Sequence, residues 1–112
     1  MLPRATAEFV DVAGTAQVPA AGALFVAAGS QEIMLTRNGA GEIVAFSGRC
    51  PHAFARLAEG RIEGGQVICA AHGARFDLAT GRSQGGCPDL PAYAVRVDGR
   101  RVLVRPGVAP QA

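Results

Sequence analysis

The sequence contains no lysine, no tryptophan, and no uninterrupted apolar run of the ~18 residues that a membrane-spanning helix needs. Its 11 basic residues are all arginines, and they are scattered among nine acidic residues, for a formal net charge of +2. A nucleic-acid-binding protein usually concentrates its positive charge and interleaves aromatic side chains with it, but aromatics make up only 5% of this chain. We therefore expect neither nucleic acid nor a membrane as a partner.

Residues 1–4 also lack the basic and apolar regions of a secretory signal, which leads us to expect a cytoplasmic protein. The 112 residues are the size of one domain, so we expect a single domain over residues 1–112, with a frayed tail at about 106–112. The core of so short a chain is modest, and a bound metal would help to stabilise it.

The sequence predicts a nearly all-β fold, because short segments rich in Val, Ile and Phe alternate with Gly, Asn and Asp turns, and no window shows a helical stripe. Asn38-Gly39 predicts a tight hairpin turn, since both positions tolerate positive φ. Gly64-Gly65 and Asp98-Gly99 predict two further turns. The expected strands cover residues 7–12, 23–28, 31–37, 42–47, 61–63, 66–68, 93–97 and 100–105.

Two short segments carry the unusual chemistry. Cys50-Pro51-His52 is followed, after 16 residues, by Cys69-Ala70-Ala71-His72, and these segments contain the only two histidines of the chain. Each segment can form one tight loop that presents a thiolate and an imidazole, and the hairpin between them would bring the loops together. We therefore predict that Cys50, His52, Cys69 and His72 bind a metal centre.

A structural zinc site is one alternative, because two Cys and two His suit tetrahedral zinc. Zinc modules, however, favour one Cys pair and one His pair, whereas each segment here mixes one Cys with one His. A zinc-binding interaction module therefore remains a remote alternative.

The C-x-H and C-x-x-H segments resemble the Rieske [2Fe–2S] signature, and the resemblance covers essentially the whole chain. Leu57 matches the first loop, Thr80-Gly81 follows the second, and residues 85–88 fall where the family has a Pro-containing loop over the cluster. The resemblance implies an antiparallel β-sandwich or barrel with a small cluster-binding subdomain formed by two loops, at about residues 48–91.

The resemblance also implies one [2Fe–2S] cluster and a role for each ligand. Cys50 and Cys69 would bind the inner iron as thiolates, and His52 and His72 would bind the outer iron and form the electron exit. Two neutral imidazoles in place of thiolates make such a centre easier to reduce than an all-cysteine cluster.

Four further positions indicate the kind of Rieske protein. Respiratory members bridge their loops with a disulfide and place hydroxyl donors near the cluster, at positions that hold Ala55, Ala71, Ala74 and Phe76 here. Without the donors we expect a potential near the low end of the Rieske range, about −150 mV.

The chain therefore resembles soluble Rieske ferredoxins, which are not enzymes themselves. The resemblance implies a monomer that passes single electrons from a flavoprotein ferredoxin reductase to a terminal oxygenase of a ring-hydroxylating dioxygenase system. The small Rieske subunit of an NAD(P)H-dependent nitrite reductase, or of another oxidoreductase, is the alternative.

Three further expectations concern the surroundings of the site. If Arg56 or Arg75 flanks the cluster, the partner should present carboxylates, although many oxygenase ferredoxins are acidic. Leu57 and Pro88 are candidates to shield the cluster from water. Cys87 is expected to be a passive residue of the covering loop.

Overall fold

The computed structural model describes residues 9–51, 55–71 and 73–106. Nearly all of its regular structure is β, as predicted, and every strand pair among these residues is antiparallel. The strands are β1 (Val10–Gly14), β2 (Leu24–Ala28), β3 (Gln31–Arg37), β4 (Ile43–Ser47), β5 (Arg61–Glu63), β6 (Gln66–Ile68), β7 (Arg75–Asp77), β8 (Ala92–Tyr93), β9 (Val95–Asp98) and β10 (Arg101–Val104). Two single-turn 3-10 helices, η2 (Thr15–Gln17) and η3 (Leu57–Glu59), join them, and the described part of the chain has no helix able to span a bilayer.

The strands form three sheets, ordered β1-β10-β9, β2-β3-β4-β8 and β5-β6-β7. The first two enclose the larger core, as the two layers of a β-sandwich do. Its buried members are Ala13, Val18, Ala28, Ile33, Leu35, Ala45, Tyr93, Val102 and Val104. Burial raises the pKa of Tyr93. On the outside of the sandwich Arg101 donates to Asp11 across β10 and β1 and lowers the pKa of that carboxyl.

The β2-β3-β4-β8 sheet has a hydrophobic core on each of its two faces, and successive side chains of β3 point alternately into the two cores. Ile33 and Leu35 point into the larger core, while Met34 belongs to a second core beneath the Cys/His loops. Thr36 is also fully buried, and its hydroxyl donates to the Leu78 carbonyl. A continuous buried run in β3 therefore follows from a sheet that lies between two cores.

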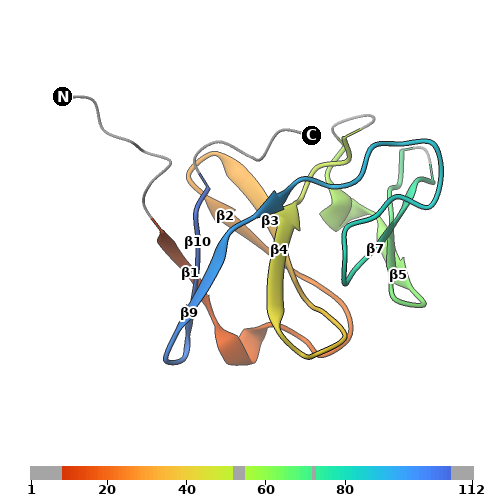
Figure 1. Ribbon diagram of the computed structural model, residues 1–112. Helices are drawn as coiled ribbons and strands as arrows, with labels where there is room; N and C mark the ends of the chain where they lie inside the picture. Colours follow the sequence, from red (N-terminus) through yellow and green to blue (C-terminus); the bar gives the residue numbers. More distant parts are fainter. Residues whose placement is uncertain (1–8, 52–54, 72, 107–112) are drawn as a thin grey trace.

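The segment that carries the Cys/His loops leaves the sandwich after β4 and returns to it at β8. The Ser47 N–H donates to the Pro91 carbonyl at 2.9 Å, and β4 pairs with β8, so the outgoing and returning chains lie side by side. Figure 1 shows the resulting arrangement, with β5 and β7 grouped at one side of the sandwich. Both ends of the segment are thus held in one ladder.

The strand expected at residues 93–97 is wrong as a single element. Tyr93 ends β8 in the central sheet, whereas Val95 begins β9 in the outer sheet. Both side chains nevertheless pack on the larger core. The chain changes sheets at Ala94, a corner that a period-2 pattern does not reveal.

Two of the three turns also differ from expectation. The hairpin between β3 and β4 is present, but its loop is five residues long, Asn38 Oδ1 accepts the Ala40 and Glu42 N–H groups, and the positive φ falls on Gly41. The last turn is shifted by one residue, since Gly99-Arg100 joins the paired Asp98 and Arg101.

The Gly64-Gly65 turn is as predicted, with φ of 55° and 79°. The first strand begins later than expected within the described residues, at Val10, and continues to Gly14. Residues 7 and 8 of that prediction, and the expected tail beyond Pro106, lie outside the described residues.

Candidate metal centre

The two Cys/His segments form loops that are closed in the same way. The Cys50 N–H donates to the Ala55 carbonyl, and the Cys69 N–H donates to the Ala74 carbonyl, each at 2.8 Å. In both loops the bond joins a cysteine to the residue five positions later. His52 and His72 belong to these loops by sequence but lie outside the described residues.

Both cysteine side chains are buried in the second core. Cys50 is 0% exposed and Cys69 is 1% exposed, and neither forms a disulfide. They share this core with Met34, Phe46, Leu57, Val67, Phe76, Leu78 and Leu90. The structure thus brings together the two predicted ligands that it describes, in a site from which water is excluded.

Gly60 lies at a close contact between the end of the first loop and the start of the second. A Cβ atom at this position would lie 1.9 Å from the Ile68 carbonyl oxygen and 3.4 Å from the Ala70 nitrogen. The chain that leaves the first loop therefore packs directly on the backbone on either side of Cys69. Sequence reasoning missed this contact, because Gly60 is one of 15 glycines and no local pattern distinguishes it.

The base of the first loop is held by charge. Arg49 and Arg56 face each other across it in an antiparallel bridge. Glu32 of β3 lies between them, with Oε1 3.1 Å from the Arg49 Nε and Oε2 2.7 Å from the Arg56 Nε. A signal for Glu32 was present in the sequence: it shares a strand face with Met34, and a charge on a buried face needs a partner.

The base of the second loop is part of a β-ladder. Ile68 pairs with Arg75 between β6 and β7, at the position that Arg49 and Arg56 occupy in the first loop. Ile68 is 4% exposed, and Phe76 beside Arg75 is 0% exposed. The Arg75 Nη1 donates to the Gln66 side chain at 3.2 Å.

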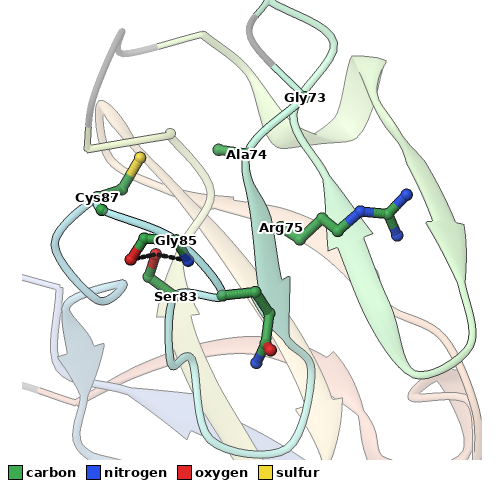
Figure 2. Close-up of a pocket in the computed structure, with 8 residues that line it drawn as sticks. Gly73, Ala74, Arg75, Ser83, Gly85 and Cys87 are labelled. Atoms are coloured by element: carbon green, nitrogen blue, oxygen red, sulfur yellow. Dashed lines mark hydrogen bonds between the residues drawn. The ribbon is translucent and has the colours of Figure 1, made fainter.

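The segment after β7 folds back over the second loop. The Gln84 N–H donates to the Arg75 carbonyl, and the Ser83 N–H donates to the Asp89 carboxylate. Between this segment and the loop lies a hollow of about 290 Å³, which Figure 2 shows. Cys87 lies at its rim, and Arg75 extends away from Cys87.

Leu57 and Pro88, the two residues expected to shield the cluster, differ in their exposure to solvent. Leu57 is buried beside the cysteines at 1% exposure. Pro88 is exposed, and its shielding of the cluster stays a prediction, while Leu90 and the half-buried Cys87 pack in the second core.

Comparison with known proteins agrees with this geometry. The family model of the Rieske [2Fe-2S] domain matches residues 8–100. The chain belongs to the Rieske [2Fe–2S] family. The ferredoxin component of a naphthalene 1,2-dioxygenase system from Pseudomonas aeruginosa is 31% identical over 88% of this chain and 96% of the relative. The solved ferredoxin of carbazole 1,9a-dioxygenase from Nocardioides aromaticivorans IC177 is 32% identical, with a TM-score of 0.72, over 88% and 97% of the two chains.

This Rieske protein has one [2Fe–2S] cluster as its cofactor, and it is an electron-transfer component rather than a catalytic enzyme. The residues present fit that cofactor. Two buried thiols on loops closed by the same hydrogen bond would serve as its sulfur ligands, since burial of such thiols as thiolates is favourable only when a metal binds them. Because the chain belongs to this family, we no longer consider it a zinc-binding module.

Proposed function

We propose that the protein is a soluble Rieske ferredoxin that takes single electrons from a flavoprotein reductase and delivers them to a terminal oxygenase, as a monomer in the cytoplasm. The relatives support this role, because they are the ferredoxin components of dioxygenase systems. The match extends over 96% of the Pseudomonas aeruginosa relative, which is a separate component of its system.

We further propose that Cys50 and Cys69 bind one iron and that His52 and His72 bind the other. The observation that carries this assignment is the pair of buried thiols on two loops with the same closing hydrogen bond. When bound, the cluster supplies one-electron redox chemistry. The described residues of the second core exclude water from the thiolate side of the proposed site. In this proposal residues 48–91 form the cluster-binding subdomain of a single domain.

The surroundings of the second loop support a low potential. Ala74 has no hydroxyl, and Phe76 is packed in the second core, so neither side chain can donate a hydrogen bond to a cluster sulfur. Such donors stabilise the more negative reduced state. We therefore propose a potential near the lower limit of the Rieske range, about −150 mV.

The charges near the loops indicate the chemistry of the partner. Glu32 and Glu59 neutralise Arg56 within the chain, whereas the ion pairs of the described residues leave out Arg75. Arg75 is exposed and directly follows the second loop. We propose that a partner carboxylate contacts Arg75 during electron transfer.

Metal analysis and spectroscopy test the ligand assignment. Anaerobic reconstitution should give two irons and two sulfides per chain, with the low average g value of a histidine-ligated [2Fe–2S] centre after reduction. Cys50→Ser and Cys69→Ser should lose the cluster, while Cys87→Ser, the matched control, should retain it. His52→Cys and His72→Cys should lower the potential or lose the cluster. Stoichiometric zinc without iron or sulfide would contradict the assignment.

Electron transfer with purified partners tests the role. A flavoprotein reductase of a dioxygenase system should reduce the loaded protein, and the reduced protein should support turnover of the oxygenase. Sedimentation should give the mass of one chain. Stable co-purification with a large catalytic subunit from the native cell would instead favour the nitrite-reductase alternative.

A further inference from the structure

We propose that Glu32 is a positioning residue that clamps the first loop to β3 by bridging Arg49 and Arg56. This inference rests on the proposed function, because it concerns the loop that carries the proposed ligands Cys50 and His52. It adds a residue that lies outside both ligand segments, 18 positions before Cys50.

The Glu32 clamp compensates for an unfavourable pairing of two arginines at the base of the first loop. Arg49 and Arg56 are directly opposed across an antiparallel bridge, a position where two like charges are destabilising. They lie next to the two residues of the closing hydrogen bond, Cys50 and Ala55. Repulsion between the two guanidinium groups would therefore act where the loop is closed.

Glu32 converts this repulsion into attraction. Its two carboxylate oxygens are divided between the arginines, at 3.1 Å from the Arg49 Nε and 2.7 Å from the Arg56 Nε. The Glu32 side chain is 23% exposed, so these ion pairs are screened less than those at a fully exposed site. The Gly48 N–H also donates to the Glu32 carbonyl at 2.9 Å, which fixes the same residue to the loop through the main chain.

Glu59 has a smaller part in this arrangement. It lies 3.4 Å from the Arg56 Nη1, and its side chain is 66% exposed. An exposed pair at this distance contributes little. Among the ion pairs of the described residues, those of Glu32 reach both arginines and that of Glu59 reaches Arg56 only, so we assign the clamp to Glu32.

Salt distinguishes a clamp of this kind from a packing contact. In the wild type, salt screens an attraction and should loosen the loop. In Glu32→Gln, salt screens the remaining repulsion between Arg49 and Arg56 and should tighten the loop. The salt dependence of cluster retention should therefore change sign, whereas a packing contact would give no such reversal.

The test is the rate of iron release from the loaded protein to a chelator, under anaerobic conditions, at about 0.01 M and about 1 M salt, where the Debye length is about 30 Å and 3 Å. The wild type should release iron faster as salt rises. Glu32→Gln should release it about fivefold faster than the wild type at low salt, the factor that corresponds to ~1 kcal/mol, and should slow as salt rises.

Two further variants make the result specific. Glu63→Gln removes a carboxylate from the exposed Arg61–Glu63 pair of β5 and should keep the wild-type rate and the wild-type sign. Adding Arg49→Gln to Glu32→Gln removes the repulsion and should restore most of the lost retention, so the double mutant reveals the coupling between the two sites.

The outcomes separate this inference from the proposed function. If the wild type loads iron and sulfide while Glu32→Gln keeps the wild-type rate and salt dependence, the clamp is wrong and the proposed function stands. If the wild type takes up no iron or sulfide, the proposed function is wrong, and the role of the clamp at the cluster is wrong with it.

Discussion

The two ligand loops are closed by the same hydrogen bond but are held in place by different forces. At the base of the first loop, Arg49 and Arg56 are about half exposed and lie around a single carboxylate. At the corresponding position of the second loop, Ile68 and Arg75 belong to the ladder of a sheet in which Val67 and Phe76 are fully buried. The same local geometry is thus reached once by electrostatics and once by packing.

This difference predicts different sensitivities for the two loops. Ion pairs near the surface respond to salt and to loss of a single charge, whereas a packed core responds to loss of volume and hardly to salt. Gly60 is the point at which the two loops meet, since it packs against the backbone around Cys69. A substitution at Gly60 should therefore affect the structure of both loops.

The largest effect is expected from Phe76→Ala, which removes the packing beneath the second loop. Phe76 is fully buried and pairs with Val67 in the ladder that ends at Ile68, one residue before Cys69. Truncating a buried Phe to Ala typically costs about 3–5 kcal/mol. Thermal unfolding of the loaded protein should shift to a much lower temperature, and iron release should accelerate equally at low and high salt.

Val104→Ala is the matched change in the larger core, where Val104 is also fully buried. It should lower the unfolding temperature while leaving the rate of iron release from the folded protein close to that of the wild type. A strong salt dependence of iron release in Phe76→Ala would mean that the second loop is held by charge after all.

Gly60→Ala should have the next largest effect, because it drives a methyl group against the Ile68 carbonyl. The backbone must shift, and overpacking of this kind typically costs about 1–3 kcal/mol. Because the shift occurs next to Cys69, the EPR spectrum of the reduced cluster should change as well. Spectra and unfolding curves of the reconstituted variant measure both effects.

Gly39→Ala is the control for this substitution. Gly39 has no positive φ, and a Cβ atom there meets nothing within 4 Å. It should unfold like the wild type and give an unchanged spectrum. If Gly60→Ala also gave an unchanged spectrum, the contact would not set the spacing of the loops.

The sequence was sufficient where the pattern is local. The fold class, the hairpin at Gly64-Gly65 and the segments that hold Cys50 and Cys69 follow from period-2 alternation, glycine tolerance of positive φ, and ligand spacing. Each of these signals lies within a few residues, so it can be interpreted without knowing how the sheets pack.

The sequence was insufficient where the cause is distant in the chain. Glu32 precedes Arg56 by 24 residues, and the bend at Ala94 depends on which sheet each half of the strand joins. Gly60 matters only because β6 folds back on it. The alternation in β3 marks Glu32 as a charge that needs a partner, but no local pattern identifies Arg49 and Arg56 as its partners or encodes the corner at Ala94 and the contact at Gly60.

The smallest effect is expected from Arg75→Gln. This substitution tests whether the charge next to the second loop contributes to binding of the partner protein. Arg56 is paired with Glu32 and Glu59, so of these two arginines Arg75 is the one whose charge would be available for the proposed docking. Losing one exposed charge at an interface rim changes mainly the association rate and its salt dependence. Reduction by a purified dioxygenase reductase should slow by a few fold at low salt, with a flatter salt dependence and unchanged iron content. Arg100→Gln, which makes the same charge change in the β9–β10 turn, should leave the rate near the wild-type value; equal slowing in both variants would assign the effect to net charge rather than to docking at the second loop.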